Sequence, residues 1–335
     1  MKETTIQLAH GGGGRLSRQL IEAEILSRFG DGPLRQLPDA AVLPPTGGAM
    51  VFTTDSFVVQ PLDFPGGNIG DLAVYGTVND IAACGGVPLW LSIGLILEEG
   101  LALETLRRVL DSIGSAAEDC GVTVATGDTK VVGRGQCDGM YINTAGIGRR
   151  LEGYDLSTAR ISEGDCVLVS GPLGDHGMAV LSVREGIDIA GGPCSDSAPV
   201  HRLVHAAAES AAAVHFMRDP TRGGLAAVLN EAVEGRQLDV TLIEDDIPVS
   251  AGTRAVAEML GLDPLHSASE GRIVAFCAPD GADRVLSAWN GLPEGQRAVR
   301  IGLVNNGCGS VVMRTVTGGR CLVDVPRGEL LPRIC

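Results

Sequence analysis

The sequence is poor in aromatic side chains and in positive charge. Phe, Trp and Tyr make up only 3% of its 335 residues, so smaller apolar side chains must fill most of the core. Lys and Arg number 26 against 41 Asp and Glu, which gives a formal net charge of −15. Because nucleic acids and anionic membrane surfaces repel a protein of this charge, we expect neither as a partner.

The sequence also lacks several motifs. No apolar run reaches the roughly 18 residues that a membrane span needs, and the N-terminus shows no signal-peptide pattern. The nine cysteines are an odd number without Cys-x-x-Cys spacing, which argues against a zinc cage or a full disulfide framework and predicts reduced thiols in the cytoplasm. Gly-x-x-x-x-Gly-Lys-Ser/Thr does not occur, so this is not a P-loop protein.

Glycine, in contrast, is abundant. The 47 glycines are about twice the average usage, which predicts tight turns and backbone that approaches a ligand closely. Gly11, Gly12 and Gly13 begin a run of four glycines that cannot form a stable element. This run predicts a flexible loop whose amides follow a bound ligand.

The length suggests two domains. Strand-like apolar runs alternate with helical stripes in both halves, which predicts α/β architecture. We expect an N-terminal domain at 1–155, a C-terminal domain at 156–317 and a mobile tail at 318–335. The expected elements include strands at 50–54 and 122–125 and helices at 69–84 and 200–214.

Three acids of the first domain stand at the ends of expected elements, namely Asp55, Asp80 and Asp128. If two of these carboxylates lay about 4 Å apart, they would repel by roughly 4 kcal/mol at an effective dielectric near 20. Mg²⁺ removes that penalty and prefers carboxylate and phosphate oxygens. Helix capping or turn formation explains any one of the acids. The three together, beside glycine-rich turns, favour a metal–nucleotide site.

Further charged residues accompany these acids. Lys130 would place an ammonium beside Asp128, to neutralise a phosphate or transfer a proton, and a solvated surface lysine is the alternative. In the second half, Asp219 and Arg222 lie in a turn that opens into a helix, where N-terminal amides suit a phosphate. Glu270 precedes an expected strand, which is a weak signal by itself.

The chain ends on Cys335. The last eight residues, 328–335, would span roughly 27 Å when fully extended. Such an arm could present its thiol to an outside partner and then return it to a site on its own body. The alternative is that one of nine cysteines happens to fall last.

Ten short segments, in matching order, resemble one known family: 10–15, 52–57, 65–67, 76–80, 98–100, 126–132, 143–146, 219–224, 268–271 and 332–335. This family is that of the HypE hydrogenase maturation factors, within the aminoimidazole ribonucleotide synthetase-like (PurM-like) superfamily of ATP enzymes. The terminal Pro-Arg-Ile-Cys is the most specific segment, because it separates HypE from its superfamily relatives. Stretches 150–200 and 279–325 show little resemblance.

The resemblance implies a PurM-like fold with an N-terminal sheet that pairs in a homodimer, an α+β C-terminal domain, and ATP and Mg²⁺ in a cleft supplied partly by the second subunit. The implied nucleotide-binding residues are Gly11, Gly12, Gly13, Asp55, Asn79, Asp80, Asp128, Thr129, Lys130, Asp219 and Arg222. The implied metal ligands are Asp55, Asp80, Asp128 and Asp219, and the implied catalytic residues are Cys335, Lys130 and Glu270.

The implied activity is that of a carbamoyl dehydratase. Cys335 would receive a carbamoyl group from the carbamoyltransferase HypF. Oxide is a poor leaving group, so ATP would phosphorylate the carboxamide oxygen, and loss of phosphate would leave a thiocyanate. The cyanide would pass to a HypC–HypD iron complex that serves [NiFe]-hydrogenase assembly.

Two alternatives stay open at this point. One is an ATP-dependent kinase or synthetase for a small molecule, of the thiamine monophosphate kinase or selenophosphate synthetase type. The other is a non-enzymatic nucleotide-binding assembly factor whose tail docks a partner.

Overall fold

A four-stranded sheet organises the N-terminal domain, with strand order β1-β6-β4-β5. These strands are β1 (Met50–Phe57), β6 (Met140–Arg150), β4 (Gly86–Glu98) and β5 (Thr123–Val132). β4 and β5 are parallel and connected through helix α3 (Leu103–Cys120), whereas the other pairs are antiparallel. The computed structural model describes residues 4–12, 15–29, 34, 40–325 and 333–335.

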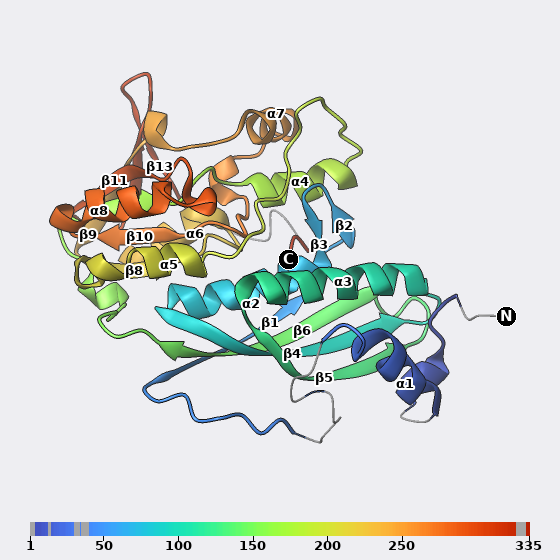
Figure 1. Cartoon of the computed structure of the whole chain (residues 1–335). Coiled ribbons are helices and arrows are strands. Elements are labelled where there is room, and N and C mark those ends of the chain that lie inside the picture. The colour runs from blue at the N-terminus through green and yellow to red at the C-terminus, as the bar shows by residue number, and fades with distance from the viewer. Residues whose placement is uncertain (1–3, 13–14, 30–33, 35–39, 326–332) are drawn as a thin grey trace.

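Helices α2 (Ile69–Ala83) and α3 cover one face of this sheet and lie between it and the C-terminal domain (Figure 1). α3 buries a single apolar stripe that includes Leu106, Val109 and Ile113, as expected for an amphipathic surface helix. α2 is buried on nearly all sides, because it contacts β1, β6 and β4 below and α5 and β8 of the C-terminal domain above.

The opposite face of the sheet presents apolar side chains to solvent. Met50 and Phe52 on β1 are 57% and 68% exposed, and Ile96 on β4 is 37% exposed. Alternate residues of a strand point to opposite faces, so Thr53 and Asp55 of β1 face the helices instead.

The C-terminal domain contains a seven-stranded sheet in the order β13-β12-β9-β11-β7-β10-β8. Its strands are β7 (Cys166–Val169), β8 (Val214–Arg218), β9 (Leu238–Ile243), β10 (Val274–Cys277), β11 (Val299–Asn306), β12 (Val311–Arg314) and β13 (Arg320–Leu322). Its helices are α4 (Asp175–Arg184), α5 (His201–Ala206), α6 (Gly224–Val233), α7 (Ala251–Leu260) and α8 (Pro279–Asn290). α6 packs in the core on one face of the sheet, and α5 and α8 pack in the core on the other.

Shorter elements complete the described chain. In the N-terminal domain these are η1 (Leu8–Gly11), α1 (Arg15–Leu20), η2 (Ile21–Ile25), β2 (Asp63–Phe64) and β3 (Gly67–Asn68). In the C-terminal domain they are η4 (Thr158–Arg160), η5 (Ala208–Ala213), η6 (Glu244–Asp246), η7 (Pro264–His266) and η8 (Pro293–Gly295). No helix among the described residues has both the length and the apolar character that a membrane crossing requires.

The expected helix at 200–214 is wrong. The structure has α5, then the 3-10 turn η5, and then strand β8, which starts at Val214 and pairs with β10. The alanine-rich run favours a helix locally, but pairing with β10 outweighs that preference at its end.

Two expected strands are too short. β1 continues to Phe57 and β5 continues to Val132, so Asp55 and Asp128 lie inside strands rather than after them. None of the residues that β5 adds is buried, and β1 adds two polar residues before Phe57, so the apolar runs alone did not reveal these extensions. β13 lies in the stretch assigned to the tail and pairs with β12.

Candidate active site

Four carboxyl groups converge where the two domains meet. Asp55 comes from β1 and Asp80 from α2, whereas Asp219 follows β8 and Glu270 precedes β10. We call these four residues the carboxylate site. Thr53 Oγ1 donates a hydrogen bond of 2.7 Å to Asp80 Oδ2, which orients that side chain on the helix-covered face of the sheet.

Burial and mutual repulsion change the acidity of this site. Burial, followed by repulsion from Asp80, raises the pKa of Asp55 to about 6 and that of Asp219 to about 7. The same two effects raise the pKa of Glu270 well above its usual range, with Asp219 as the strongest neighbour. Glu270 is only 2% exposed, and its Oε1 atom has no hydrogen-bond partner among the described residues. A site with these properties favours protons or cations.

Both sides of the Glu270 main chain are held in place. Asn79 Nδ2 donates to Glu270 O at 2.8 Å, and Asp196 Oδ1 accepts from Glu270 N at 3.0 Å. Arg272 lies 3.4 Å from the other carboxylate oxygen of Asp196. The Glu270 side chain, whose Oε1 atom has no partner among the described residues, is therefore carried by a backbone held on both sides.

The chain end docks beside this site. Val58 N donates to Cys335 O at 3.2 Å, and Gln60 N donates to Arg333 O at 3.4 Å. The Cys335 Sγ atom lies 4.0 Å from Arg222 Nη2. Burial, followed by repulsion from Glu270, raises the pKa of the docked thiol to about 11, so it is protonated at neutral pH. Figure 1 shows the C-terminus between the two domains.

Asp128 and Lys130 lie on β5, away from the carboxylate site of the same chain. β5 and β1 are opposite edges of the sheet and are separated by two strands, about 14 Å at the usual strand spacing. A bulge in the pairing of β4 with β5 adds Ala125 to β5. This extra residue turns Asp128 and Lys130 to the face without helices, opposite to Asp55. Their side chains are 68% and 65% exposed and form an ion pair of 3.3 Å.

The glycine segment accompanies this second group. Gly11 packs so closely on β5 that a Cβ atom there would be 2.6 Å from Val131 N. Thr129 donates its backbone N–H to Asp128 Oδ1 at 2.8 Å. We call Gly11, Gly12, Asp128, Thr129 and Lys130 the β5 group. Gly13 lies outside the described residues.

A magnesium ion fits the carboxylate site only with help from other ligands. Among the described residues, no group of three or more His, Cys, Asp or Glu side chains is arranged to hold a metal ion. Mg²⁺ usually takes one or two carboxylates and completes its shell with phosphate oxygens and water. Asp55, Asp80 and Asp219 therefore suit a magnesium–phosphate complex better than a bare ion.

Sequence reasoning missed the residues that hold the tail. Arg184 donates to Gln60 O and to Arg333 O, and the Arg333 guanidinium pairs with Asp138 and lies 5.9 Å from the Tyr141 ring centre. Arg184, like Asp196, belongs to the stretch 150–200, which carries little family resemblance. Their partners are distant in sequence, so no local pattern could have identified them.

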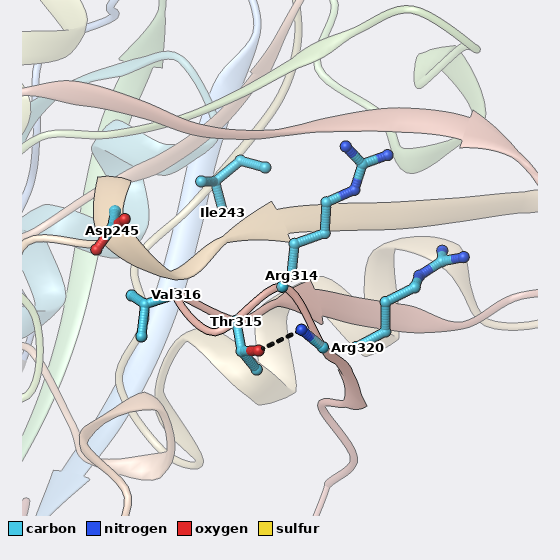
Figure 2. Close-up of a pocket in the computed structure, with 8 residues that line it drawn as sticks. Ile243, Asp245, Arg314, Thr315, Val316 and Arg320 are labelled. Carbon is cyan, nitrogen blue, oxygen red and sulfur yellow. Dashed lines mark hydrogen bonds between the residues drawn. The ribbon is translucent and has the colours of Figure 1, made fainter.

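A separate pocket of about 500 Å³ lies at the turn between β12 and β13 (Figure 2). It is lined by Ile243, Asp245, Arg314, Thr315, Val316, Gly318, Gly319 and Arg320. Arg314 and Arg320 face each other across the β12–β13 pair, and both guanidinium groups point away from Asp245 in Figure 2. None of the predicted site residues lines this pocket, so it is distinct from the candidate active site.

Family comparisons agree with this architecture. The family model described as AIR synthase related protein, N-terminal domain, matches residues 38–150, and the corresponding C-terminal domain model matches residues 162–314. The two domains and the carboxylate site between them therefore define a member of the AIR synthase-related, or PurM-like, class.

Closer relatives narrow this class. Carbamoyl dehydratase HypE of Rhizobium leguminosarum bv. viciae is 48% identical over 332 residues, which cover 98% of this chain and 95% of that protein. A structure of the hydrogenase maturation protein HypE in complex with ATP superposes with a TM-score of 0.95 at 44% identity, covering 99% of this chain and all of that one. A chain of the HypE–HypF complex gives 0.81 at 39% identity, covering 93% and 100%. The chain belongs to the HypE family, as the sequence resemblance predicted.

Proposed function

We propose that this protein is an ATP-dependent carbamoyl dehydratase that converts an S-carbamoyl group on its own Cys335 into a thiocyanate. One observation carries the proposal: the chain end docks so that Cys335 lies beside Arg222 and next to Glu270. Relatives named carbamoyl dehydratase and a relative solved with ATP support it.

The proposed reaction removes water in two steps. ATP transfers its γ-phosphoryl group to the carboxamide oxygen, and the C–O bond then breaks as phosphate leaves. The nitrogen gives up two protons as the C≡N bond forms. One carboxamide and one ATP therefore give one thiocyanate, ADP, phosphate and one free proton, the other proton leaving on the phosphate.

Glu270 is placed to accept a proton from the amide nitrogen. Burial and neighbouring carboxylates raise its pKa, so its carboxylate form is a stronger base than an ordinary glutamate. Asp55, Asp80 and Asp219 would hold Mg²⁺ through its phosphate complex. The ion would neutralise phosphate charge during transfer.

We further propose that the β5 group acts on the carboxylate site of a second copy, in a homodimer. In one chain the two groups lie on opposite edges and opposite faces of the sheet. Phe52 and Met50 expose apolar surface on the face that Asp128 and Lys130 share. If this surface is buried in a dimer and the β5 edge of each copy meets the β1 edge of its partner, the β5 group of each copy comes beside the strand that carries the partner's carboxylate site. Lys130 would then neutralise a phosphate there or transfer a proton.

The partner enzymes follow from the same chemistry. The docked thiol is protonated and partly buried between the domains, so the tail must leave the site to accept its carbamoyl group from HypF. A relative solved as a HypE–HypF complex supports that partner. The thiocyanate would then supply cyanide to the HypC–HypD complex for the [NiFe]-hydrogenase iron centre.

Mass analysis of the C-terminal peptide tests this function. After incubation with the carbamoyltransferase, its carbamoyl donor and ATP, the peptide should gain one carbamoyl group and then lose one water. Without ATP it should stop at the carboxamide. A small-molecule kinase would consume ATP only with a free substrate and independently of Cys335, and an assembly factor would leave Cys335 unchanged. Either of these results would overturn the proposal.

A further inference from the structure

His176 is a fully buried residue of α4, and both of its ring nitrogens have partners. Nε2 lies 2.9 Å from Ile334 O in the docked tail, and Nδ1 lies 2.8 Å from Ser195 Oγ. A carbonyl oxygen can only accept, so Nε2 carries the hydrogen and Nδ1 accepts from the serine hydroxyl. Ser195 Oγ also accepts from Ser197 N at 3.1 Å, which leaves its own hydrogen for the imidazole.

The neighbours of His176 therefore fix its tautomer. Burial lowers the pKa of His176 to about 4, against the opposing effect of the Ile334 carbonyl, so the ring is neutral at physiological pH. The ring also meets Phe64 edge-on, with ring centres 5.2 Å apart. A neutral imidazole held on three sides offers one donor in one direction.

Contacts to the tail come from two sides. The tail ends in a turn at Arg333, whose φ is 57°, rather than in a regular strand. The first and third of the last three carbonyls, those of Arg333 and Cys335, accept from Gln60 N and Val58 N. The middle carbonyl, Ile334 O, accepts from His176 of the C-terminal domain. A shift of the tail by one residue would break all three of these hydrogen bonds, so together they define its register.

His176 also connects the tail to the backbone that carries Glu270. Ser195, its hydroxyl partner, is followed by Asp196, whose Oδ1 accepts from Glu270 N at 3.0 Å. Ser195 N donates to Pro65 O at 2.7 Å, which fixes this loop against the N-terminal domain. The tail and Glu270 are thus positioned by adjacent residues of one loop.

We propose that His176 is a positioning residue that fixes the register of the docked tail and thereby holds Cys335 beside Glu270. This role of His176 rests on the proposed dehydratase function, since the register of the tail matters only if the Cys335 thiol reacts beside Glu270. The docking itself can be measured without ATP or a partner enzyme. The two can therefore fail separately.

Alkylation of Cys335 by iodoacetamide, followed on the C-terminal peptide by mass spectrometry, measures docking in the full-length protein. His176→Phe keeps the ring and its contact with Phe64 but leaves Ile334 O unpaired, so the tail should open more often and Cys335 should react about tenfold faster. His176→Gln places an amide donor near the position of Nε2 and should restore slow alkylation. The exposed Cys308 should react at one rate throughout and serves as an internal reference.

His201→Phe is the matched control, because His201 is a buried histidine of the same domain that meets another ring, that of His205, edge-on. It should leave the Cys335 rate unchanged. The proposal is wrong if His176→Phe reacts at the wild-type rate, if Gln and Phe accelerate alkylation equally, or if His201→Phe matches His176→Phe. If His176→Phe does not fold, Ser195→Ala provides the test instead. It removes the hydroxyl that keeps the hydrogen of His176 on Nε2, so alkylation of Cys335 should accelerate severalfold. An unchanged rate in Ser195→Ala would overturn the proposal.

A turnover measurement separates this proposal from the proposed function. In carbamoylated protein, His176→Phe should slow thiocyanate formation, and His176→Gln should recover it, at unchanged ATP affinity. If the wild type forms no thiocyanate but the alkylation pattern holds, the dehydratase function fails and the docking role stands.

Discussion

Asn79 and Glu270 lie 191 positions apart, yet Asn79 Nδ2 donates a hydrogen bond of 2.8 Å to Glu270 O across the domain boundary. The same amide group donates to Ala198 O at 3.0 Å, and its oxygen accepts from Val200 N at 2.8 Å. Asn79 is fully buried, so protein groups must supply all of its hydrogen bonds. This one side chain sets the position of Glu270 relative to the helix that carries Asp80.

Asn79→Ala should therefore destabilise the protein and impair the site. It leaves two buried carbonyls and one N–H unpaired, which should lower the free energy of unfolding by about 2–4 kcal/mol in urea titration. Thiocyanate formation should fall as well. Asn290→Ala is the matched control, because Asn290 bonds Leu286 O, Ala298 O and Arg297 N from an exposed position. Equal losses in both variants would contradict the role given to Asn79.

Asp80→Asn should separate carbamoylation from dehydration. The change keeps the size of the side chain and a group that can accept from Thr53, but it removes a charge from the proposed magnesium–phosphate site. The tail should still accept its carbamoyl group, so Cys335 carboxamide should accumulate even with excess ATP. Mass analysis of the C-terminal peptide measures this. Asp155→Asn, at a carboxylate whose side chain is 81% exposed, should behave as wild type; a normal thiocyanate rate in Asp80→Asn would rule out the carboxylate-site reading.

Cys335→Ala should give the complementary result. It removes the only group proposed to carry the carbamoyl, so covalent modification should vanish while ATP affinity changes little. Calorimetric titration with ATP and magnesium checks the second part. Cys308→Ala, at a cysteine that is exposed and distant from the docked tail in sequence, should leave both properties intact. Full cyanide delivery by Cys335→Ala would be incompatible with the proposed chemistry.

The contribution of Asp219 to the stability of the ligand-free protein should fall as pH rises from about 4 to 7. Burial, then Asp80, raises the pKa of Asp219 from 3.8 to about 7, so the folded state keeps a proton that the unfolded state releases in this range. The full effect is about 4 kcal/mol at most, and it is complete above both pKa values. Asp219→Asn should flatten the dependence of unfolding free energy on pH between 5.5 and 7.5, and Asp155→Asn should not. An equal slope in Asp219→Asn and wild type would show that Asp219 does not titrate as described.

Mixing two inactive variants tests the proposed dimer. Lys130→Ala damages the β5 group and Asp80→Asn damages the carboxylate site. If each site combines residues from two copies, a mixed dimer has one intact site. Random exchange should then restore about a quarter of the wild-type sites, since half of the dimers are mixed. Phe52→Glu, which places charge on the exposed apolar face, should abolish both dimerisation and rescue. Recovery without dimers, or dimers without recovery, would exclude the shared site.

The sequence predicts the family and the fold, because short motifs at fixed turns carry that information. It groups Asp55, Asp80 and Asp219, but it adds Asp128, which lies apart from them in one chain. It does not predict which face of the sheet Asp128 occupies. That depends on one extra residue in β5. A single inserted residue turns the side chains of all later residues in the strand to the opposite face of the sheet. An apolar run at 122–125 reads as a strand with or without such a bulge.

The tail contacts are hidden for a different reason. His176 and Ile334 are 158 positions apart, and the bond between them uses a main-chain carbonyl. Main-chain groups are the same at every residue, so no side-chain pattern marks the partner. The role of Asp196 cannot be predicted from the sequence for the same reason, because its side chain accepts a hydrogen bond from the backbone N–H of Glu270.

The attachment of Cys335 to the body that would dehydrate it has a stoichiometric consequence. The carboxamide is delivered at an effective concentration set by the polypeptide, so its reaction should be first order and show no saturation with added carboxamide. Each chain can complete one dehydration. It can react again only after an acceptor has removed the cyanide from the Cys335 sulfur. Pre-loaded protein mixed with ATP should give a burst of one thiocyanate per chain and then stop. Sustained cyanide supply would therefore depend on how fast an acceptor empties the thiol rather than on how fast the thiocyanate forms.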